Sequence, residues 1–335
     1  MTEFADPKWP EAAVFADESI PEEARALNAR IVAALSAVPD RRATPPAVAR
    51  ARRAAGQGIF PLCTPDPHAE TLLVAGIGGH DIPLRVLRPR NRPARGTYLH
   101  IHGGGWVMGS PCENDERLRR IAENTGLITV SVDYRLAPEH SYPDAPDDCE
   151  AAALWLLTDK SHDLPLGFLA IGGESAGGHL AAVTLLRLRD RHGLWPFHAA
   201  NLVAGCYDLD GTPSVRNWGE EPLVLATADV VHSTGLFLGD GRDRRDPDIS
   251  PLYARLDRMP PALFTCGTKD LLIDDTMMMA QRWHATGNGV EVAIYPGGCH
   301  VFQCWPTAQA EDSLARMDTF LNSRIDAVTT RREAP

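Results

Sequence analysis

The sequence predicts an α/β fold in which a mostly parallel central sheet is flanked by helices and carries a helical cap. Two observations lead to this prediction. From about residue 70 onward, short apolar or β-branched runs alternate with helical patterns, which is typical of a parallel sheet covered on both faces. Residues 1–55, in contrast, show helical patterns only, and residues 206–250 interrupt the alternation with a long, charged, loop-rich stretch.

The opening segment contains two predicted helices. Proline at position 21, followed by two glutamates, is typical of a first helical turn, and apolar residues then recur at helical spacing. Pro39 is expected to end this helix, and a second helix is expected from Pro46 to Ala55. Residues 41–53 carry five arginines and no acidic residue, so this part of the segment is strongly basic.

Strands and helices are expected to alternate through the remainder of the chain. The expected strands are 71–76, 82–87, 97–101, 127–133, 168–171, 200–204, 262–266 and 290–295. The expected helices are 115–124, 146–157, 176–190, 275–286 and 307–322. A Gly-Gly turn at 78–79 separates the first two strands, so we expect these two to be antiparallel.

Composition excludes several classes of protein. With 33 basic and 44 acidic side chains the net charge is −11, which argues against a nucleic-acid partner or an anionic membrane surface. The seven cysteines are scattered and form no Cys-x-x-Cys pair, so neither a disulfide framework nor a zinc site is expected. The acidic first 19 residues are unlike a secretory signal, and the apolar run 151–157 is too short to span a bilayer. We expect a cytoplasmic protein with no membrane insertion.

The strongest motif is Gly173-Glu174-Ser175-Ala176-Gly177, which has an expected strand before it and an expected helix after it. G-x-S-x-G in this context is typical of a serine nucleophile held at a tight strand-to-helix turn. Without that context the same letters would indicate an ordinary glycine-rich turn. The sequence therefore predicts that Ser175 is a nucleophile.

A second motif, His102-Gly103-Gly104-Gly105-Trp106, follows the expected strand 97–101. Consecutive glycines let backbone N–H groups approach an oxyanion without obstruction by side chains. A phosphate-binding loop is the alternative, but the Gly-Lys-Ser/Thr that it requires is absent. His102 is expected to brace this loop by hydrogen bonding.

A nucleophilic serine needs a base and an acid that orients the base. His300 is the candidate base because it follows the last expected strand, and Asp270 is the candidate acid because it ends the segment ALFTCGTKD. The chain order Ser, Asp, His is one that such hydrolases use. Asp208, Asp274 and Asp275 remain alternative acids.

Taken together, the motifs resemble those of hormone-sensitive-lipase-type α/β-hydrolases, the bacterial family IV carboxylesterases. The matching stretches run in order from about residue 70 to 322: HGGGW, DYRLAPEH, GESAGG, SPLYARLDRMPPALFTCGTKDLLIDD and PGGCHVF. The resemblance implies an α/β-hydrolase domain formed by residues 56–205 and 251–335. It also implies a cap with an N-terminal part, residues 1–55, and a second segment, residues 206–250.

The resemblance further implies roles for individual residues. Ser175 would be the nucleophile, Asp270 the acid and His300 the base. The amides of Gly104, Gly105 and Ala176 would form the oxyanion hole, with support from His102, Gly103, Trp106 and Glu174. Within DYRLAPEH, Arg135, Asp133 and Glu139 would pair near the site. The chain departs from the family at Glu174, where Asp is usual, at Leu271, where proline is common, and at Val301, where glycine is usual.

The expected activity is hydrolysis of short- to medium-chain carboxylic esters through an acyl-enzyme, with no metal or organic cofactor. The same triad would serve a deacetylase, lactonase or amidase acting on a specialised metabolite, and these alternatives stay open. A non-catalytic small-molecule receptor on this scaffold is the third alternative, disfavoured because His300 is present. The resemblance also implies that a homodimer could form through the last strand and helix.

Overall fold

A central eight-stranded sheet organises the molecule. The computed structural model describes residues 9–38, 41–158 and 161–333. The strands are β1 (Glu70–Ala75), β2 (Asp81–Leu87), β3 (Gly96–Ile101), β4 (Leu127–Val132), β5 (Leu169–Glu174), β6 (Ala199–Val203), β7 (Ala262–Lys269) and β8 (Val290–Cys299). Their order in the sheet is β1-β2-β4-β3-β5-β6-β7-β8. Strands β1 and β2 are antiparallel to each other, β2 is antiparallel to β4, and every other neighbouring pair is parallel.

The central strands are buried on both faces, which explains why they read as continuous apolar runs. Every residue of β3, β4, β5 and β6 is buried. The mostly parallel α/β sheet predicted from the sequence is confirmed.

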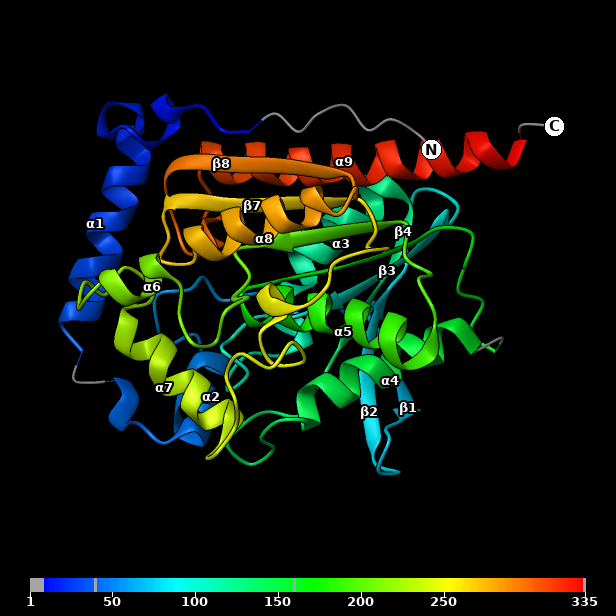
Figure 1. Ribbon diagram of the computed structural model, residues 1–335, viewed down its shortest axis with the longest axis horizontal. Coiled ribbons are helices and arrows are strands. Elements are labelled where there is room, and N and C mark those ends of the chain that lie inside the picture. The colour runs from blue at the N-terminus through cyan, green and yellow to red at the C-terminus, as the bar shows by residue number, and fades with distance from the viewer. Residues whose placement is uncertain (1–8, 39–40, 159–160, 334–335) are drawn as a thin grey trace.

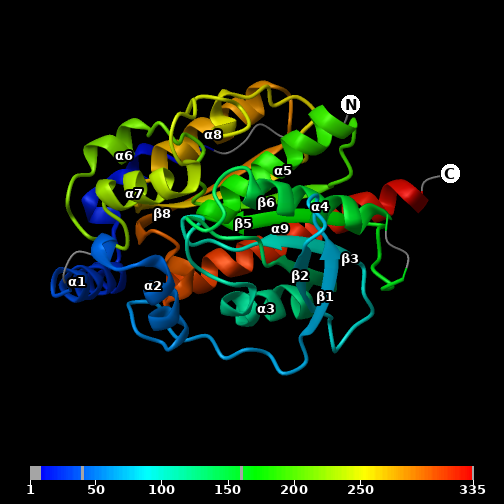
Figure 2. The ribbon, with the colours of Figure 1, turned by 90° about the horizontal axis from the view of Figure 1, so that it is seen from below.

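Helices cover both faces of this sheet and one of its ends (Figures 1 and 2). Helices α3 (Asp115–Thr125) and α9 (Ala308–Glu333) pack on one face. On the other lie α4 (Asp144–Thr158), α5 (Ala176–His192) and α8 (Ile273–Ala285). Two hydrophobic clusters fill the spaces between these layers. No helix within the described part of the chain is both long enough and apolar enough to cross a lipid bilayer.

Four further helices gather at one end of the sheet, on the left in Figure 1. They are α1 (Glu22–Ser36) and α2 (Pro46–Ala54) from the opening segment, and α6 (Pro213–Asn217) and α7 (Thr227–Leu238) from the stretch that interrupts the alternation. Helix α1 buries Leu27 and Ile31 on one face and is joined to β8 by a hydrogen bond from Asn28 to the Gly297 carbonyl. Pro39, expected to end the first helix, lies outside the described residues.

Candidate active site

Ser175 sits on the sharp turn between β5 and α5. Its φ of 57° and ψ of −122° are unusual for a residue with a side chain, and strain of this kind is common at functional sites. The Ser175 amide donates to the Val203 carbonyl on the neighbouring strand at 2.9 Å, which fixes the turn. A Cβ at Gly177 would lie 1.9 Å from the Ile101 carbonyl oxygen, so only glycine fits at this position.

Ser175, His300 and Asp270 are joined by a continuous chain of hydrogen bonds. The Ser175 Oγ lies 2.9 Å from His300 Nε2, and His300 Nδ1 lies 2.9 and 3.1 Å from the two carboxylate oxygens of Asp270. Because a carboxylate can only accept, Nδ1–H donates to Asp270 and Nε2 is left to accept from the serine hydroxyl. His300 is 4% exposed and Asp270 is 1% exposed, so the contact between this histidine and the carboxylate is almost fully shielded from water.

Strand pairing brings Asp270 and His300 together. Both β7 and β8 are longer than the sequence predicts, and their last residues, Lys269 and Cys299, face each other across the sheet after a register shift. Asp270 directly follows β7, and His300 directly follows β8. Their proximity therefore follows from the pairing of two neighbouring parallel strands.

The alternative acids have other partners. Asp274 accepts a hydrogen bond from a backbone amide at the start of α6, and Asp275 accepts from two backbone amides and a threonine hydroxyl. Asp208 accepts from the Tyr253 hydroxyl at 3.0 Å. Of these candidates, Asp270 is the one bonded to His300.

Three backbone amides around Ser175 are available to a ligand. Within the described residues, no protein group accepts a hydrogen bond from the N–H of Gly104, Gly105 or Ala176. Gly104 has a φ of +121°, and a Cβ there would lie 2.1 Å from the Met108 carbonyl oxygen, so this bend requires glycine. The Ala176 amide is at the N-terminus of α5, where amide donors and the helix dipole favour negative charge.

His102 lies inside the glycine loop as a structural group. Its Nδ1–H donates to the Gly103 carbonyl at 2.8 Å, its ring stacks on Tyr134 with centroids 4.2 Å apart, and the Tyr134 hydroxyl donates to the His102 carbonyl. Burial lowers the pKa of His102 to about 4, so the ring is neutral near pH 7. Its contacts hold the loop and do not reach Ser175.

Trp106 connects the same loop to two helices. Its indole N–H donates to His179 Nδ1 of α5 at 3.0 Å. Its ring stacks on Phe237 of α7, with centroids 4.7 Å apart and planes 13° from parallel. The glycine loop is therefore packed between the helix that follows Ser175 and a helix of the interrupting stretch.

Glu174, the residue before Ser175, belongs to a largely buried polar network. One carboxylate oxygen accepts from the Gly103 amide at 3.1 Å, and the other accepts from Arg117 at 2.5 Å and lies 3.1 Å from His100. Burial alone would raise the pKa of this carboxyl, but the charge of Arg117 and the contacts with both partners hold it below its ordinary value. Arg117 and His100 carry no local sequence signal for this role, because each pairs with a residue far along the chain.

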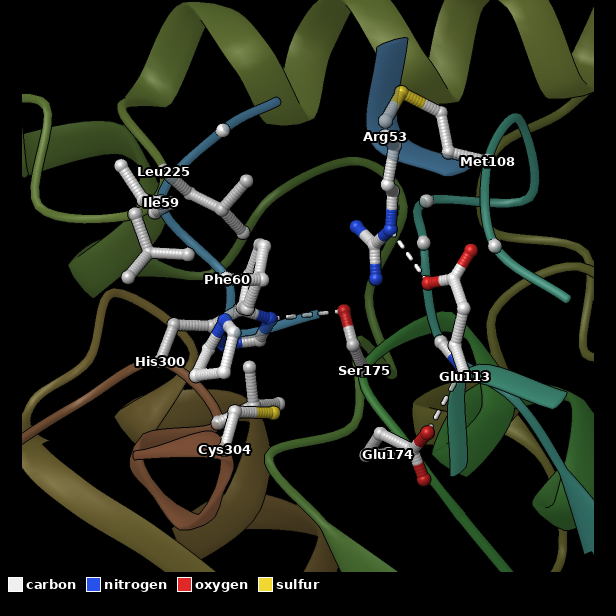
Figure 3. A pocket seen from close by; sticks show the side chains of 18 of the residues that line it. Arg53, Ile59, Phe60, Met108, Glu113, Glu174, Ser175, Leu225, His300 and Cys304 are labelled. Atoms are coloured by element: carbon white, nitrogen blue, oxygen red, sulfur yellow. Dashed lines mark hydrogen bonds and ion pairs between the residues drawn. The ribbon is translucent and has the colours of Figure 1, made fainter. Parts of the chain in front are cut away.

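A cavity of about 1720 Å³ opens above Ser175 (Figure 3). Its walls come from the opening segment, the glycine loop, α7 and the segment after His300. Apolar side chains such as Ile59, Phe60 and Leu225 face it on one side, and Arg53 enters from the other. Cys304 also lines the cavity, near His300.

The charged groups of DYRLAPEH form ion pairs with two helices. Arg135 binds Asp148 and Asp144 of α4, and Glu139 accepts two hydrogen bonds from Arg50 of α2. These ion pairs attach the segment to α4 and attach α2 to the α/β domain.

Comparisons with known proteins identify the family. A sequence profile of the alpha/beta hydrolase fold matches residues 98–304. The chain is 31% identical over 242 residues to an arylesterase of Saccharolobus solfataricus, covering 71% of this chain and 78% of that protein. It is 29% identical over 254 residues to an acetyl esterase of Salmonella choleraesuis, covering 73% and 77%.

A solved structure agrees with these sequence relatives. A hormone-sensitive lipase from a metagenome library superposes with a TM-score of 0.79 at 27% identity, covering 91% of this chain and 99% of that one. The fold, the motifs in their order and these relatives agree. The chain belongs to the hormone-sensitive-lipase-type, family IV carboxylesterases of the α/β-hydrolase fold and is a carboxylic ester hydrolase.

Proposed function

We propose that the chain is a serine carboxylesterase whose catalytic triad is Ser175, His300 and Asp270. The observation that carries the proposal is the unbroken hydrogen-bond chain from the Ser175 hydroxyl through His300 to Asp270. Beside it lie three backbone amides that have no protein acceptor among the described residues. A nucleophile, a base, an orienting acid and oxyanion donors are the parts that acyl transfer requires.

The chemistry proceeds in two steps. In the first, Ser175 Oγ attacks the ester carbonyl while His300 Nε2 takes its proton, and the developing oxyanion accepts from the Gly104, Gly105 and Ala176 amides. The C–O bond to the alcohol then breaks as His300 returns the proton to the leaving oxygen. In the second, water attacks the acyl-enzyme with the same proton transfers, which releases the acid and restores Ser175. Asp270 remains ionised and holds the imidazole tautomer.

Replacing the nucleophile tests this mechanism directly. Ser175→Ala should lower kcat for a p-nitrophenyl ester by a factor on the order of 10⁶. A fluorophosphonate probe should label the wild-type chain once, at Ser175, and should leave Ser175→Ala unlabelled. Near-normal turnover by the variant, or labelling at another residue, would refute the assignment.

For the substrate, we propose short- to medium-chain carboxylic esters. Two relatives are named acetyl esterase and arylesterase, and the cavity wall is largely apolar near Ser175. In our proposal the cap comprises residues 1–55 and 206–250, and its helices α2 and α7 supply walls of this cavity. A series of p-nitrophenyl esters from acetate to palmitate should show the highest kcat/KM at or below the medium chain lengths.

Deacetylase, lactonase and amidase activity remain outcomes of the same test, because the triad would serve each of them. A panel that includes acetylated metabolites, lactones and amides should show ester hydrolysis dominating. The receptor alternative is set aside because the chain is a carboxylic ester hydrolase. For the compartment we propose the cytoplasm, which is consistent with seven cysteines that are all free thiols.

A further inference from the structure

One arginine of the basic opening segment reaches into the cavity. Arg53 is the penultimate residue of α2, and its side chain is 26% exposed. Figure 3 shows it entering the cavity from α2, with its terminal nitrogens on the side facing the Ser175 hydroxyl. A guanidinium in this position meets the part of a substrate that extends away from the scissile bond.

Two contacts fix the orientation of this guanidinium. Its Nε donates to Glu113 Oε2 at 2.6 Å, and its central carbon lies 4.7 Å from the centre of the Phe60 ring. An arginine held by a carboxylate and an aromatic face loses little further entropy when it binds a ligand. Arg53 is therefore pre-organised.

The two terminal nitrogens of the Arg53 guanidinium are its remaining donors. Among the described residues, no protein atom accepts a hydrogen bond from either terminal nitrogen of Arg53. Arg50, one turn earlier on α2, differs because it is bonded to both carboxylate oxygens of Glu139 and does not line the cavity. Partly buried N–H groups that face a cavity without protein partners suit an acceptor supplied by the ligand.

The local charge indicates which acceptor fits. Glu113 already neutralises Arg53 through their ion pair, and Glu174, next to Ser175, is paired with Arg117. A substrate carboxylate bound to Arg53 would also lie close to the negative charge of Glu113, whereas a neutral oxygen would accept the free N–H bonds without that repulsion.

We propose that Arg53 is a substrate-binding residue that donates hydrogen bonds to a neutral carbonyl oxygen of the substrate outside the scissile ester. The preferred substrates are then oxygenated esters, such as keto esters and diesters, over plain alkyl esters. This inference rests on the ester hydrolysis proposed above and adds the chemical class of the substrate.

A matched ester panel tests the proposal. Ethyl octanoate is compared with ethyl oxo-octanoates in which the ketone is moved along the acyl chain, and hexyl butyrate with oxohexyl butyrates, which place the oxygen on the alcohol side. The wild-type chain should prefer the best oxo ester over its plain parent by about 10-fold or more in kcat/KM, the effect of a charged hydrogen bond. Whichever series shows the preference identifies the part of the substrate that Arg53 contacts.

Two arginine-to-methionine variants distinguish substrate recognition by Arg53 from the attachment of α2 to the α/β domain. Arg53→Met keeps length without donors, and the ratio of oxo to plain ester should fall to about one. Arg50→Met also breaks an ion pair between α2 and the α/β domain, but it should keep the wild-type ratio because Arg50 lies outside the cavity. A wild-type chain without preference, a preference that persists in Arg53→Met, or equal loss in Arg50→Met would each overturn the proposal.

Failure of the underlying function would look different. In that case the wild-type chain would hydrolyse neither plain nor oxo esters, or Ser175→Ala would retain turnover of both. Either result overturns the triad mechanism, and the inference on Arg53 with it. Hydrolysis of plain esters that depends on Ser175 but is indifferent to the extra oxygen overturns the role of Arg53 alone.

Discussion

At the residue scale, a charged side chain adjacent to Ser175 helps to hold the glycine loop. Glu174 is 6% exposed as a residue, and its carboxylate links the Gly103 amide of the loop to Arg117 of α3. The Glu174 side chain is long enough to reach both of these groups from β5. The Glu174 carboxylate bonds to the loop that we propose as the oxyanion hole, and none of its hydrogen bonds among the described residues is to Ser175. We therefore assign Glu174 as a positioning residue.

Removing this charge should cost stability and turnover together. Glu174→Gln leaves Arg117, whose side chain is only 15% exposed, without a counter-charge, so the free energy of unfolding should fall by about 3 kcal/mol. With the Gly103 amide less firmly held, kcat should fall by about 10-fold while KM changes little. Urea unfolding and steady-state kinetics on one ester measure both effects.

Removing both charged partners distinguishes the charge effect from a packing effect. In Arg117→Met/Glu174→Gln no uncompensated charge remains, so the double variant should unfold at a higher urea concentration than Glu174→Gln alone. Glu311→Gln, at an ion pair on the surface with Arg120, should leave the midpoint unchanged. Additive losses in the double variant would contradict the buried-pair explanation.

At the element scale, the alternation of strands and helices could be predicted because the hydrophobic pattern and the turn residues indicate the same fold. Central strands buried on both faces are continuous apolar runs, and the turns between elements are rich in glycine and proline. The end of β8 could not be predicted in this way: residues 296–298, Pro-Gly-Gly, look like a turn but lie within the strand, at an irregularity between Tyr295 and Cys299, which both pair with β7. Local propensity was overridden there by tertiary pairing.

The site was only partly predictable for a related reason. Ser175, His300 and the glycine loop carry local patterns, so sequence reasoning reaches them. The partners of Glu174 carry none, because Arg117 lies 57 residues away along the chain and resembles other surface arginines of α3. Arg53 is likewise one of five arginines in residues 41–53, and only the orientation of α2 distinguishes it.

Helix α7 supports the glycine loop through one aromatic contact. Phe237 is fully buried, with an exposed fraction of 0%, and stacks on Trp106. Phe237→Ala should lower the free energy of unfolding by about 3–5 kcal/mol because it leaves a cavity, and should lower kcat because Trp106 directly follows Gly105. Phe15→Ala, the same change at a side chain that is 46% exposed, should alter stability by less than about 0.5 kcal/mol. Equal effects of the two substitutions would show that α7 does not support the loop.

Strand β8 lies at an edge of the sheet, and edge strands can pair with another chain. From the family resemblance we predict a homodimer formed through β8 and α9. Light scattering coupled to gel filtration should then give twice the mass of the chain, and dilution should lower the measured mass toward that of a single chain. A mass equal to one chain at all concentrations would show that the protein is a monomer.

At the scale of the whole molecule, two buried histidines link stability to pH. His102 and His179 are both neutral in the fold: burial lowers the pKa of each from 6.5 to about 4. For His179 the tautomer is fixed, since Nδ1 accepts from Trp106 and Nε2–H donates to the Ile249 carbonyl at 2.8 Å. A proton on Nδ1 would break the bond that holds Trp106 against α5.

The sign of the effect follows from proton binding. Between pH 6.5 and 4 the unfolded chain binds more protons at these two sites than the folded chain does. Their contribution to stability is therefore complete above about pH 6.5 and is lost as the pH falls toward 4, by up to about 3 kcal/mol for each histidine. The whole fold, including the glycine loop, should therefore be less stable to unfolding in mild acid.

Urea unfolding from pH 7.5 down to pH 4.5 measures this loss of stability, and one substitution tests whether His179 causes it. His179→Gln can still accept from Trp106 and donate to Ile249 but cannot take up a proton, so its stability should fall less steeply with decreasing pH than that of the wild-type chain. His68→Gln, the same substitution at an exposed position, should keep the wild-type slope. Because only slopes are compared, a uniform loss of stability in His179→Gln does not obscure the result. Parallel curves for His179→Gln and the wild-type chain would mean that acid sensitivity arises elsewhere in the molecule.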